Sequence, residues 1–149
     1  MGRLIAMMLS AAVMIALLTG CSDDNRLTER VAEFEEGCNT LDVEQILDTF
    51  DPRVSGKYRM GLDLMEIVSG KSTEELLGSI IGVIPSDVDR EEVLSLVTFE
   101  VETMDIGEET AEVLTVMEYE LMGREYKYHV IFHCVYYIDD WYISYITLG

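Results

Sequence analysis

Hydrophobic residues follow two periods along this chain, a helical one in the first half and an alternating one from Leu94 onward. In the first half, apolar side chains recur three or four positions apart, and cap and breaker residues separate the segments. The pattern predicts four helices: Leu27–Gly37, Asn39–Phe50 before Asp51-Pro52, about Lys57–Val68 before Gly70, and a segment from the Ser72/Glu75 capping box to Ile84 before Pro85.

The second half predicts strands, because apolar and polar residues alternate over short runs bounded by turn residues. Four strands are expected: Leu94 to the turn at Ile106-Gly107-Glu108, Thr110–Leu121, Arg124–Ile138 after Met122-Gly123, and Trp141–Leu148 after Asp139-Asp140. Helices that precede an antiparallel meander indicate an α+β fold.

A two-residue turn at Met122-Gly123 also predicts the register of the central hairpin. Leu121 would lie opposite Arg124, and the pairs beyond it follow. On one face the charged pairs are Glu118 with Lys127 and Glu112 with His133, and on the other the apolar pairs are Met117 with Tyr128, Tyr119 with Tyr126 and Val113 with Phe132. This separation supports the register, since a one-residue slip would mix the two faces.

The first twenty residues predict a lipoprotein signal peptide. Arg3 precedes an apolar run of about fifteen residues, which is shorter than a bilayer-spanning helix. The run ends in Leu18-Thr19-Gly20-Cys21, which resembles a lipobox, so cleavage is expected between Gly20 and Cys21, with Cys21 lipidated. The alternatives are an ordinary secretory signal with an incidental cysteine, or an uncleaved anchor.

These boundaries predict a signal peptide at 1–20, the lipidated Cys21 with a short polar tether at 21–26, and one domain at 27–149. The chain carries 10 basic and 29 acidic residues, a net charge of −19, and loss of Arg3 makes it −20. Such acidity argues against nucleic acid as a partner. The expected location is extracytoplasmic, with the acyl chains as the contact to the bacterial cell membrane.

Two cysteines remain in the expected mature chain, Cys38 and Cys134. The helical spacing of Leu27, Val31 and Phe34 directs Cys38 inward, and Cys134 alternates with Phe132 on the core face of a strand. A Cys38–Cys134 disulfide is therefore a candidate in an oxidising compartment. Two separate buried thiols are the alternative.

A resemblance supports the same fold class. The helical pair spanning Val31–Phe34 and Leu41–Asp51, followed by more helix and a meander ending in Asp140–Ser144, resembles the nuclear transport factor 2-like superfamily over Leu27–Thr147. The resemblance implies N-terminal helices packed on a curved, cone-like antiparallel sheet of about four strands. Enzymes of that superfamily place an acid and a base, or a Tyr and Asp pair, inside the cone. No Asp or Glu here falls convincingly on the inward face.

Candidate chemistry is sparse, so no catalytic residue, metal ligand or cofactor is assigned. His129 and His133 lie on one strand face about 13 Å apart, too far to share a metal without neighbouring ligands. The best binding candidate is an apolar pocket of Met117, Tyr119, Tyr126 and Tyr128. The alternative is that these four only fill the core.

Leu114, Val116 and Ile131 interrupt the polar outer face of the sheet, which favours a homodimer through the sheet. The leading hypothesis is a membrane-anchored lipoprotein with a non-catalytic domain that binds a small ligand or a protein. A small cone-fold enzyme using general acid–base catalysis and a structural dimerisation module are the alternatives.

Overall fold

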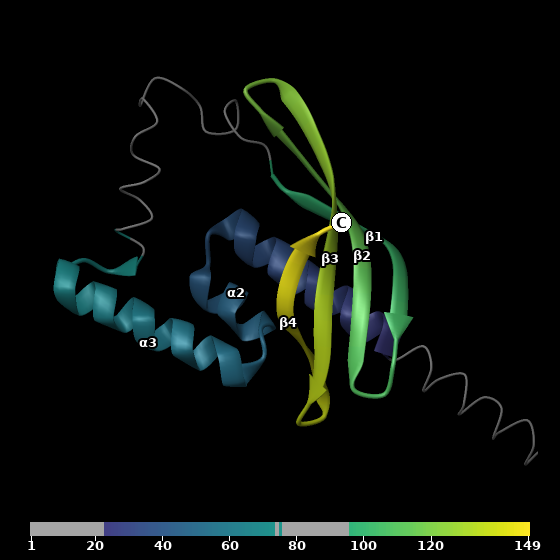
Figure 1. Cartoon of the computed structure of the whole chain (residues 1–149). Helices are drawn as coiled ribbons and strands as arrows, with labels where there is room; N and C mark the ends of the chain where they lie inside the picture. The colour runs from purple at the N-terminus through teal and green to yellow at the C-terminus, as the bar shows by residue number, and fades with distance from the viewer. Residues whose placement is uncertain (1–22, 74, 76–95) are drawn as a thin grey trace, which may run out of the picture.

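The computed structural model describes residues 23–73, 75 and 96–149, and in these ranges three helices precede a four-stranded antiparallel sheet (Figure 1). The predicted α+β class, with N-terminal helices on a sheet of four strands, is confirmed. The helices are the N-terminal helix (residues 23–40), α2 (Val43–Thr49) and α3 (Pro52–Ser69), and the strands are β1 (Thr98–Ile106), β2 (Thr110–Leu121), β3 (Arg124–Tyr137) and β4 (Asp140–Leu148).

The sheet follows chain order, β1-β2-β3-β4, and the predicted register of its central hairpin is confirmed. Leu121 pairs with Arg124, and every predicted pair beyond it occurs. Met122 and Gly123 have φ angles of 52° and 74°, the left-handed values that a two-residue hairpin turn requires at both central positions. Bulges in β1 near Thr103 and in the β3–β4 pairing near Cys134 interrupt the outer ladders.

The boundaries of the outer strands differ from the predicted ones. The β3–β4 turn consists of Ile138 and Asp139, because Tyr137 pairs with Asp140, and β4 therefore begins one residue earlier than Trp141. Ile138 has a φ of 47°, although a β-branched side chain disfavours this region. β1 begins at Thr98, and Leu94 lies outside the described residues.

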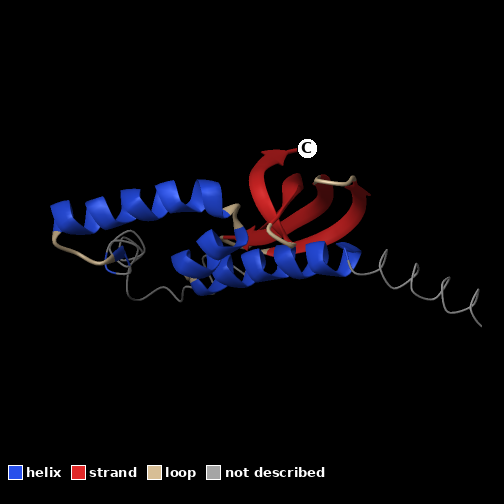
Figure 2. Cartoon of the chain, turned by 90° about the horizontal axis from the view of Figure 1, so that it is seen from below, coloured by secondary structure: helices blue, strands red, loops and turns tan. Residues whose placement is uncertain are grey.

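The N-terminal helix packs its apolar side on one face of the curved sheet (Figure 2). Leu27 is fully buried, and Phe34 contacts the rings of Phe50, Phe99 and Phe132 edge-on, with centroids 5.4–6.1 Å apart. All four phenylalanines of the chain thus fill the space between helix and sheet. The core face of the sheet is closed here by side chains.

The N-terminal helix is longer than predicted at both ends. It continues through Gly37 to residue 40, and Gly37 permits close approach of α2, because an added Cβ would lie 2.8 Å from Cγ1 of Ile46. Asn39 is not the cap of α2. That cap is Asp42, whose carboxylate accepts from the Gln45 N–H at 3.0 Å.

Asn39 instead completes the hydrogen bonding of the chain entering β1. Its amide nitrogen donates to the Val97 carbonyl, and its amide oxygen accepts from the Val97 N–H, both at 2.8 Å. Glu35 accepts from the Phe99 N–H at 2.7 Å in the same way. Side chains of the helix therefore serve as backbone partners at this edge of the sheet.

Residues 23–26, expected in the tether, belong to the N-terminal helix. Asp23 accepts from the Trp141 indole N–H at 3.1 Å, and Arg26 donates to Asp140 at 2.7 and 2.8 Å. This part of the expected tether therefore packs as part of the domain. The signal peptide and Cys21 lie outside the described residues.

α3 begins five residues before the predicted Lys57, because Asp51 caps it and Pro52 occupies its first turn. It ends as predicted at Gly70, which has a φ of 65°. The Ser72/Glu75 capping box is confirmed by two backbone N–H to side-chain hydrogen bonds of 2.9 and 3.2 Å. The helix expected from Leu76 to Ile84 lies outside the described residues.

Candidate functional site

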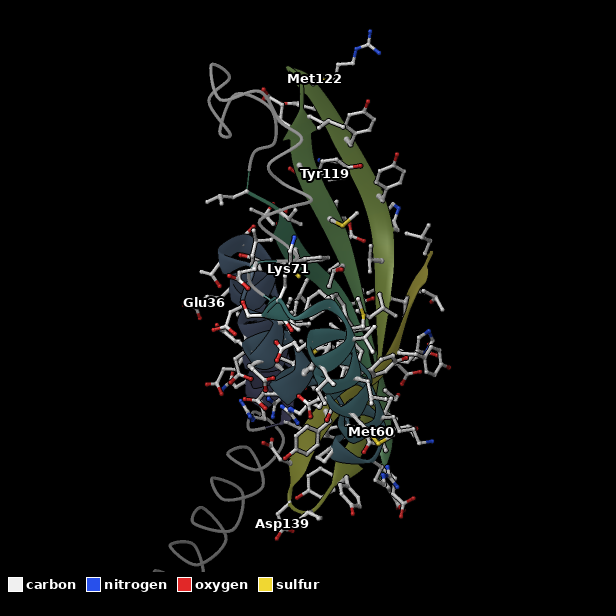
Figure 3. All side chains as sticks on the ribbon, turned by 90° about the vertical axis from the view of Figure 1, so that its left-hand side faces the viewer. Glu36, Met60, Lys71, Tyr119, Met122 and Asp139 are labelled. Carbon is white, nitrogen blue, oxygen red and sulfur yellow. The ribbon has the colours of Figure 1, made fainter. Side chains whose placement is uncertain are left out.

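The three predicted pocket tyrosines gather in a ring stack on the hairpin of β2 and β3, where Figure 3 labels Tyr119. Tyr119 and Tyr126 are directly opposite each other in the register, with ring centroids 5.2 Å apart and planes 12° apart. Tyr128 stacks on Tyr119 at 6.3 Å and is 43% exposed. Met117 lies on the same face but packs against the core cluster.

Tyr119 and Tyr126 lie where the sheet has narrowed to two strands. β1 pairing stops at Thr98, opposite Glu118, and β4 pairing stops at Leu148, opposite Val130. A twisted hairpin therefore extends beyond the four-stranded sheet and the helix that covers it (Figure 1). Aromatic rings on such a hairpin, half-buried for Tyr119 and Tyr126 and exposed for Tyr128, can contact a partner.

An open hollow of about 280 Å³ has two of these tyrosines, Tyr119 and Tyr126, among its lining residues. Its lining residues are Leu96, Thr98, Glu118, Tyr119, Glu120, Glu125, Tyr126 and Lys127, and we call it the tyrosine hollow. Met117 and Tyr128 do not line it. The volume is at the lower limit for a small-molecule site, so the hollow suits one or two side chains of a partner better than an enclosed ligand.

The tyrosine hollow carries net negative charge. Glu118, Glu120 and Glu125 contribute three carboxylates against Lys127, which forms an ion pair with Glu118. Glu118 also raises the pKa of Lys127, so this lysine stays charged. Burial, followed by the neighbouring tyrosines, raises the pKa of Tyr119, so the phenol stays protonated and serves as a donor rather than a base.

A second cluster, the Arg30 node, joins the N-terminal helix to the β3–β4 hairpin. It consists of Arg26, Arg30, Glu33 and Asp140. Although arginine side chains are mostly exposed in folded proteins, Arg30 is 5% exposed and donates to Glu33, Asp140 and the Trp141 carbonyl at 2.7–2.8 Å. Its guanidinium also lies 4.8 Å from the Tyr142 ring centroid.

Each charged group of the Arg30 node forms an ion pair with an opposite charge of the same node. Hydrogen bonds from Arg26 hold the pKa of Asp140 below its usual value, and that carboxylate raises the pKa of Arg26. An open hollow of about 590 Å³ lies beside the node, lined by Asp23, Asn25, Arg26, Glu29, Tyr136, Asp139, Asp140 and Trp141. We assign the node a structural role, because each of its ionised groups already has an opposite charge within hydrogen-bond distance.

The histidines take part in cross-strand pairs on the outer face. His133 lies opposite Glu112, as predicted, with Nδ1 3.2 Å from its carboxylate and Nε2 3.0 Å from the Thr147 hydroxyl. His129 lies 3.6 Å from Glu102. Across residues 23–73, 75 and 96–149, no three His, Cys, Asp or Glu side chains gather as metal ligands would.

Both Cys38 and Cys134 are free thiols, so the candidate disulfide is not formed in the structure. Cys134 lies near Arg30, whose charge acts on its thiol, whereas Cys38 is eight residues, or about 12 Å, farther along the helix. A disulfide requires the two Cα atoms within about 7 Å. Burial raises the pKa of the Cys134 thiol to about 12, which makes it unreactive.

The outer-face residues from which a dimer through the sheet was predicted are not exposed. Val116 is 8% exposed, and Leu114 and Ile131 are half-buried among glutamate and histidine side chains. The homodimer through the sheet stays a prediction. Exposed apolar side chains gather instead on α3, where Met60, Leu64 and Ile67 are 55–77% exposed.

The apolar surface of α3 is the feature that the sequence analysis missed. The available signal was charge, because Arg53, Lys57, Arg59 and Lys71 are four of only ten basic residues in the chain. A basic segment with apolar side chains in an acidic protein is typical of a surface helix with a partner.

Among the described residues, no helix is both long and apolar enough to cross a bilayer. Helices followed by a meander do not by themselves identify the nuclear transport factor 2-like superfamily, so that relation stays a prediction. No protein-family model, curated protein or solved structure matches this chain.

Proposed function

We propose that this protein is an extracytoplasmic lipoprotein, anchored through Cys21, whose domain binds a partner protein without catalysis. The observation that carries the binding role is the stack of Tyr119, Tyr126 and Tyr128 beside an open hollow on the projecting hairpin. Tyrosine supplies large contact area at low entropic cost and is enriched at interfaces. The carboxylates of the hollow favour a segment of the partner that combines basic and apolar side chains.

The enzyme alternative has less support from the described residues. The buried charged side chains Arg30 and Asp51 are both engaged in ion pairs, Arg30 with Asp140 and Asp51 with Arg53. The space under the sheet, where enzymes of the nuclear transport factor 2-like superfamily would hold an acid and a base, is filled by the phenylalanine cluster. An acid–base mechanism needs a perturbed group within reach of a substrate.

Two measurements test the proposal. For the anchor, intact mass analysis of the N-terminal peptide should show acyl chains on Cys21, and Cys21→Ala should remain uncleaved and unacylated. For the binding role, a peptide of alternating lysine and leucine is titrated and the hairpin amide resonances are followed by NMR. Tyr119→Ser and Tyr126→Ser should abolish the shifts.

Tyr58→Ser, which removes an exposed tyrosine from α3, is the matched control and should bind as the parent chain does. A peptide with glutamate in place of lysine should not bind, because the hollow repels it. Equal binding of both peptides, or loss of binding in Tyr58→Ser alone, would contradict the assignment of the tyrosine hollow.

A further inference from the structure

The side of α3 that faces away from the rest of the domain is apolar, and we call it the α3 outer face. Lys57, Met60, Leu64 and Ile67 recur at helical spacing and therefore share this side, with Val68 beside them. Met60, Leu64, Ile67 and Val68 are 62, 55, 77 and 86% exposed. Such contiguous exposure on one helix marks an interaction surface.

Contacts on the opposite side of α3 fix this orientation. Ser55 is buried, and Arg59 forms ion pairs with Glu44 and Asp48 of α2. Figure 2 shows that α3 projects from the domain, away from the sheet and the N-terminal helix. The α3 outer face therefore points outward because its other side is bound to α2.

Charge distinguishes this surface from the rest of an acidic chain. Arg53 and Arg59 are paired with carboxylates of the cap and of α2, but no ion pair joins Lys57 or Lys71 to any described residue. These two lysines lie at either end of the apolar stripe, with Lys71 directly after the Gly70 cap. Flanking lysines on an apolar helix face are typical of helices that lie in a membrane interface.

The first turn of α3 and the start of the N-terminal helix contact the same β3–β4 hairpin. Asp23, two residues after Cys21, is bonded to Trp141 next to the β3–β4 turn. Arg53, in the first turn of α3, lies 4.2 Å from the Tyr137 ring of the same hairpin. Figure 3 shows Met60 and Asp139 toward one end of the molecule and Met122 toward the other.

We propose that the α3 outer face docks on the surface of the phospholipid bilayer that holds the anchor. Met60, Leu64, Ile67 and Val68 would enter the boundary between headgroups and acyl chains, and Lys57 and Lys71 would lie at the lipid phosphates. This inference rests on the proposed lipidation of Cys21, which keeps the face near the bilayer at an effective concentration on the order of millimolar. The bilayer is preferred over a second copy of the chain, because paired outer faces would bring lysine against lysine in either orientation.

The test uses the full acylated protein reconstituted in vesicles of phosphatidylcholine, with and without phosphatidylglycerol, that carry brominated acyl chains. Ile67→Trp places a fluorophore on the α3 outer face, and Met122→Trp is the matched control at the opposite end, since both side chains are 77% exposed. Trp141 is 2% exposed and supplies a constant background. Bromolipid should quench Ile67→Trp strongly and Met122→Trp no more than the background.

A second comparison tests the lysines. Adding Lys57→Glu and Lys71→Glu to the Ile67→Trp protein should reduce quenching on vesicles with phosphatidylglycerol to the level of the Met122→Trp protein. Arg124→Glu, at the tip of the β2–β3 hairpin, should leave the quenching unchanged. Circular dichroism checks that each variant remains folded.

The outcomes separate this inference from the proposed function. If mass analysis finds acyl chains on Cys21 but Ile67→Trp is unquenched on both vesicle types, the anchor stands and the docking is overturned. In that case an acidic protein becomes the partner that the α3 outer face fits. If Cys21 carries no acyl chain, the anchor and the docking both fail.

Discussion

At the scale of single residues, Arg30 joins the two halves of the chain. Its buried guanidinium binds Asp140 and the Trp141 carbonyl on the last hairpin and Glu33 on its own helix. A buried ion pair adds little net stability when it is intact, but removal of one partner leaves an uncompensated charge. The specificity of helix docking therefore depends on this side chain.

Arg30→Ala should lower the free energy of unfolding by about 3 kcal/mol, because Asp140 and the Trp141 carbonyl lose a buried donor. Urea unfolding followed by circular dichroism measures the change. Arg124→Ala removes an exposed arginine from the hairpin tip and should cost less than about 0.5 kcal/mol. Equal effects of the two substitutions would rule out the structural role of the node.

The carboxylates at helix docking points should make the fold sensitive to acid. The pKa of Asp140 is lowered by hydrogen bonds from Arg26, and that of Asp51 by hydrogen bonds from Arg53. Since the folded pKa lies below the unfolded value of about 3.8, their stabilisation is present above that pH and is lost as the pH falls through the folded pKa.

The urea midpoint should therefore fall between about pH 5 and about pH 2. Asp140→Asn should start from a lower midpoint at neutral pH and lose less over that range. Asp24→Asn, whose carboxyl is exposed at the start of the N-terminal helix, is the control and should follow the parent curve. A parent midpoint that rises on acidification would refute this assignment.

At the scale of elements, the two tight hairpin turns use side chains that disfavour their backbone conformation. Met122 and Ile138 both occupy the first position of a turn with φ near 50°, where Asn or Gly is preferred. Both are more than 70% exposed, so packing in the described domain does not account for them. Strain in an exposed turn can be relieved without loss of core contacts.

Ile138→Asn should raise the free energy of unfolding by about 1 kcal/mol, since asparagine tolerates the left-handed region. Ile138→Val keeps the β-branched side chain and should give no gain. Thermal unfolding of the two variants measures the difference. If valine stabilises as much as asparagine, removal of exposed apolar surface rather than backbone strain explains the gain.

The predictability of each element depends on whether its signal is local. The central hairpin was predicted residue by residue, because alternation and a two-residue turn determine the register. The extension of the N-terminal helix past Gly37 was missed, because the reason for that glycine is the approach of Ile46. The Met60–Ile67 stripe has the same period whether it faces a core or the outside, so the sequence could not decide its direction.

In the candidate site too, the features with a local sequence signal were predicted and those without one were missed. The pairing of Tyr119 with Tyr126 was predicted from the register, and it brings the two rings close enough to stack. The absence of Met117 and Tyr128 from the lining of the hollow was not predicted, because it depends on where β1 and β4 stop pairing. Burial of Arg30 was missed too, since its partner Asp140 lies 110 residues away.

At the scale of the whole molecule, the tyrosine stack and the α3 outer face are at different ends. Figure 3 shows Tyr119 and Met122 toward one end and Met60 toward the other. With α3 against a bilayer, as proposed, the projecting hairpin would point away from the lipid. The tyrosine hollow would then be accessible to a partner in the surrounding compartment.

Thiol accessibility should report on the integrity of the whole domain. Iodoacetamide should modify half-buried Cys38 slowly and leave Cys134 unmodified until the protein unfolds, because burial raises the pKa of Cys134 to about 12. Peptide mapping by mass spectrometry follows both sites. Cys38→Ser should not change the behaviour of Cys134, and a disulfide-linked pair of peptides in the untreated protein would contradict two free thiols.

The hydrogen bonds between the N-terminal helix and the last hairpin also bear on when the protein can fold. Five of them, made by Arg26, Arg30 and Trp141, connect residues 110–118 positions apart in the sequence. Contacts of such long sequence separation form slowly and require the last strand to be present. If the chain is exported amino end first, as the proposed lipoprotein would be, the N-terminal helix cannot dock until nearly all of the polypeptide has been translocated.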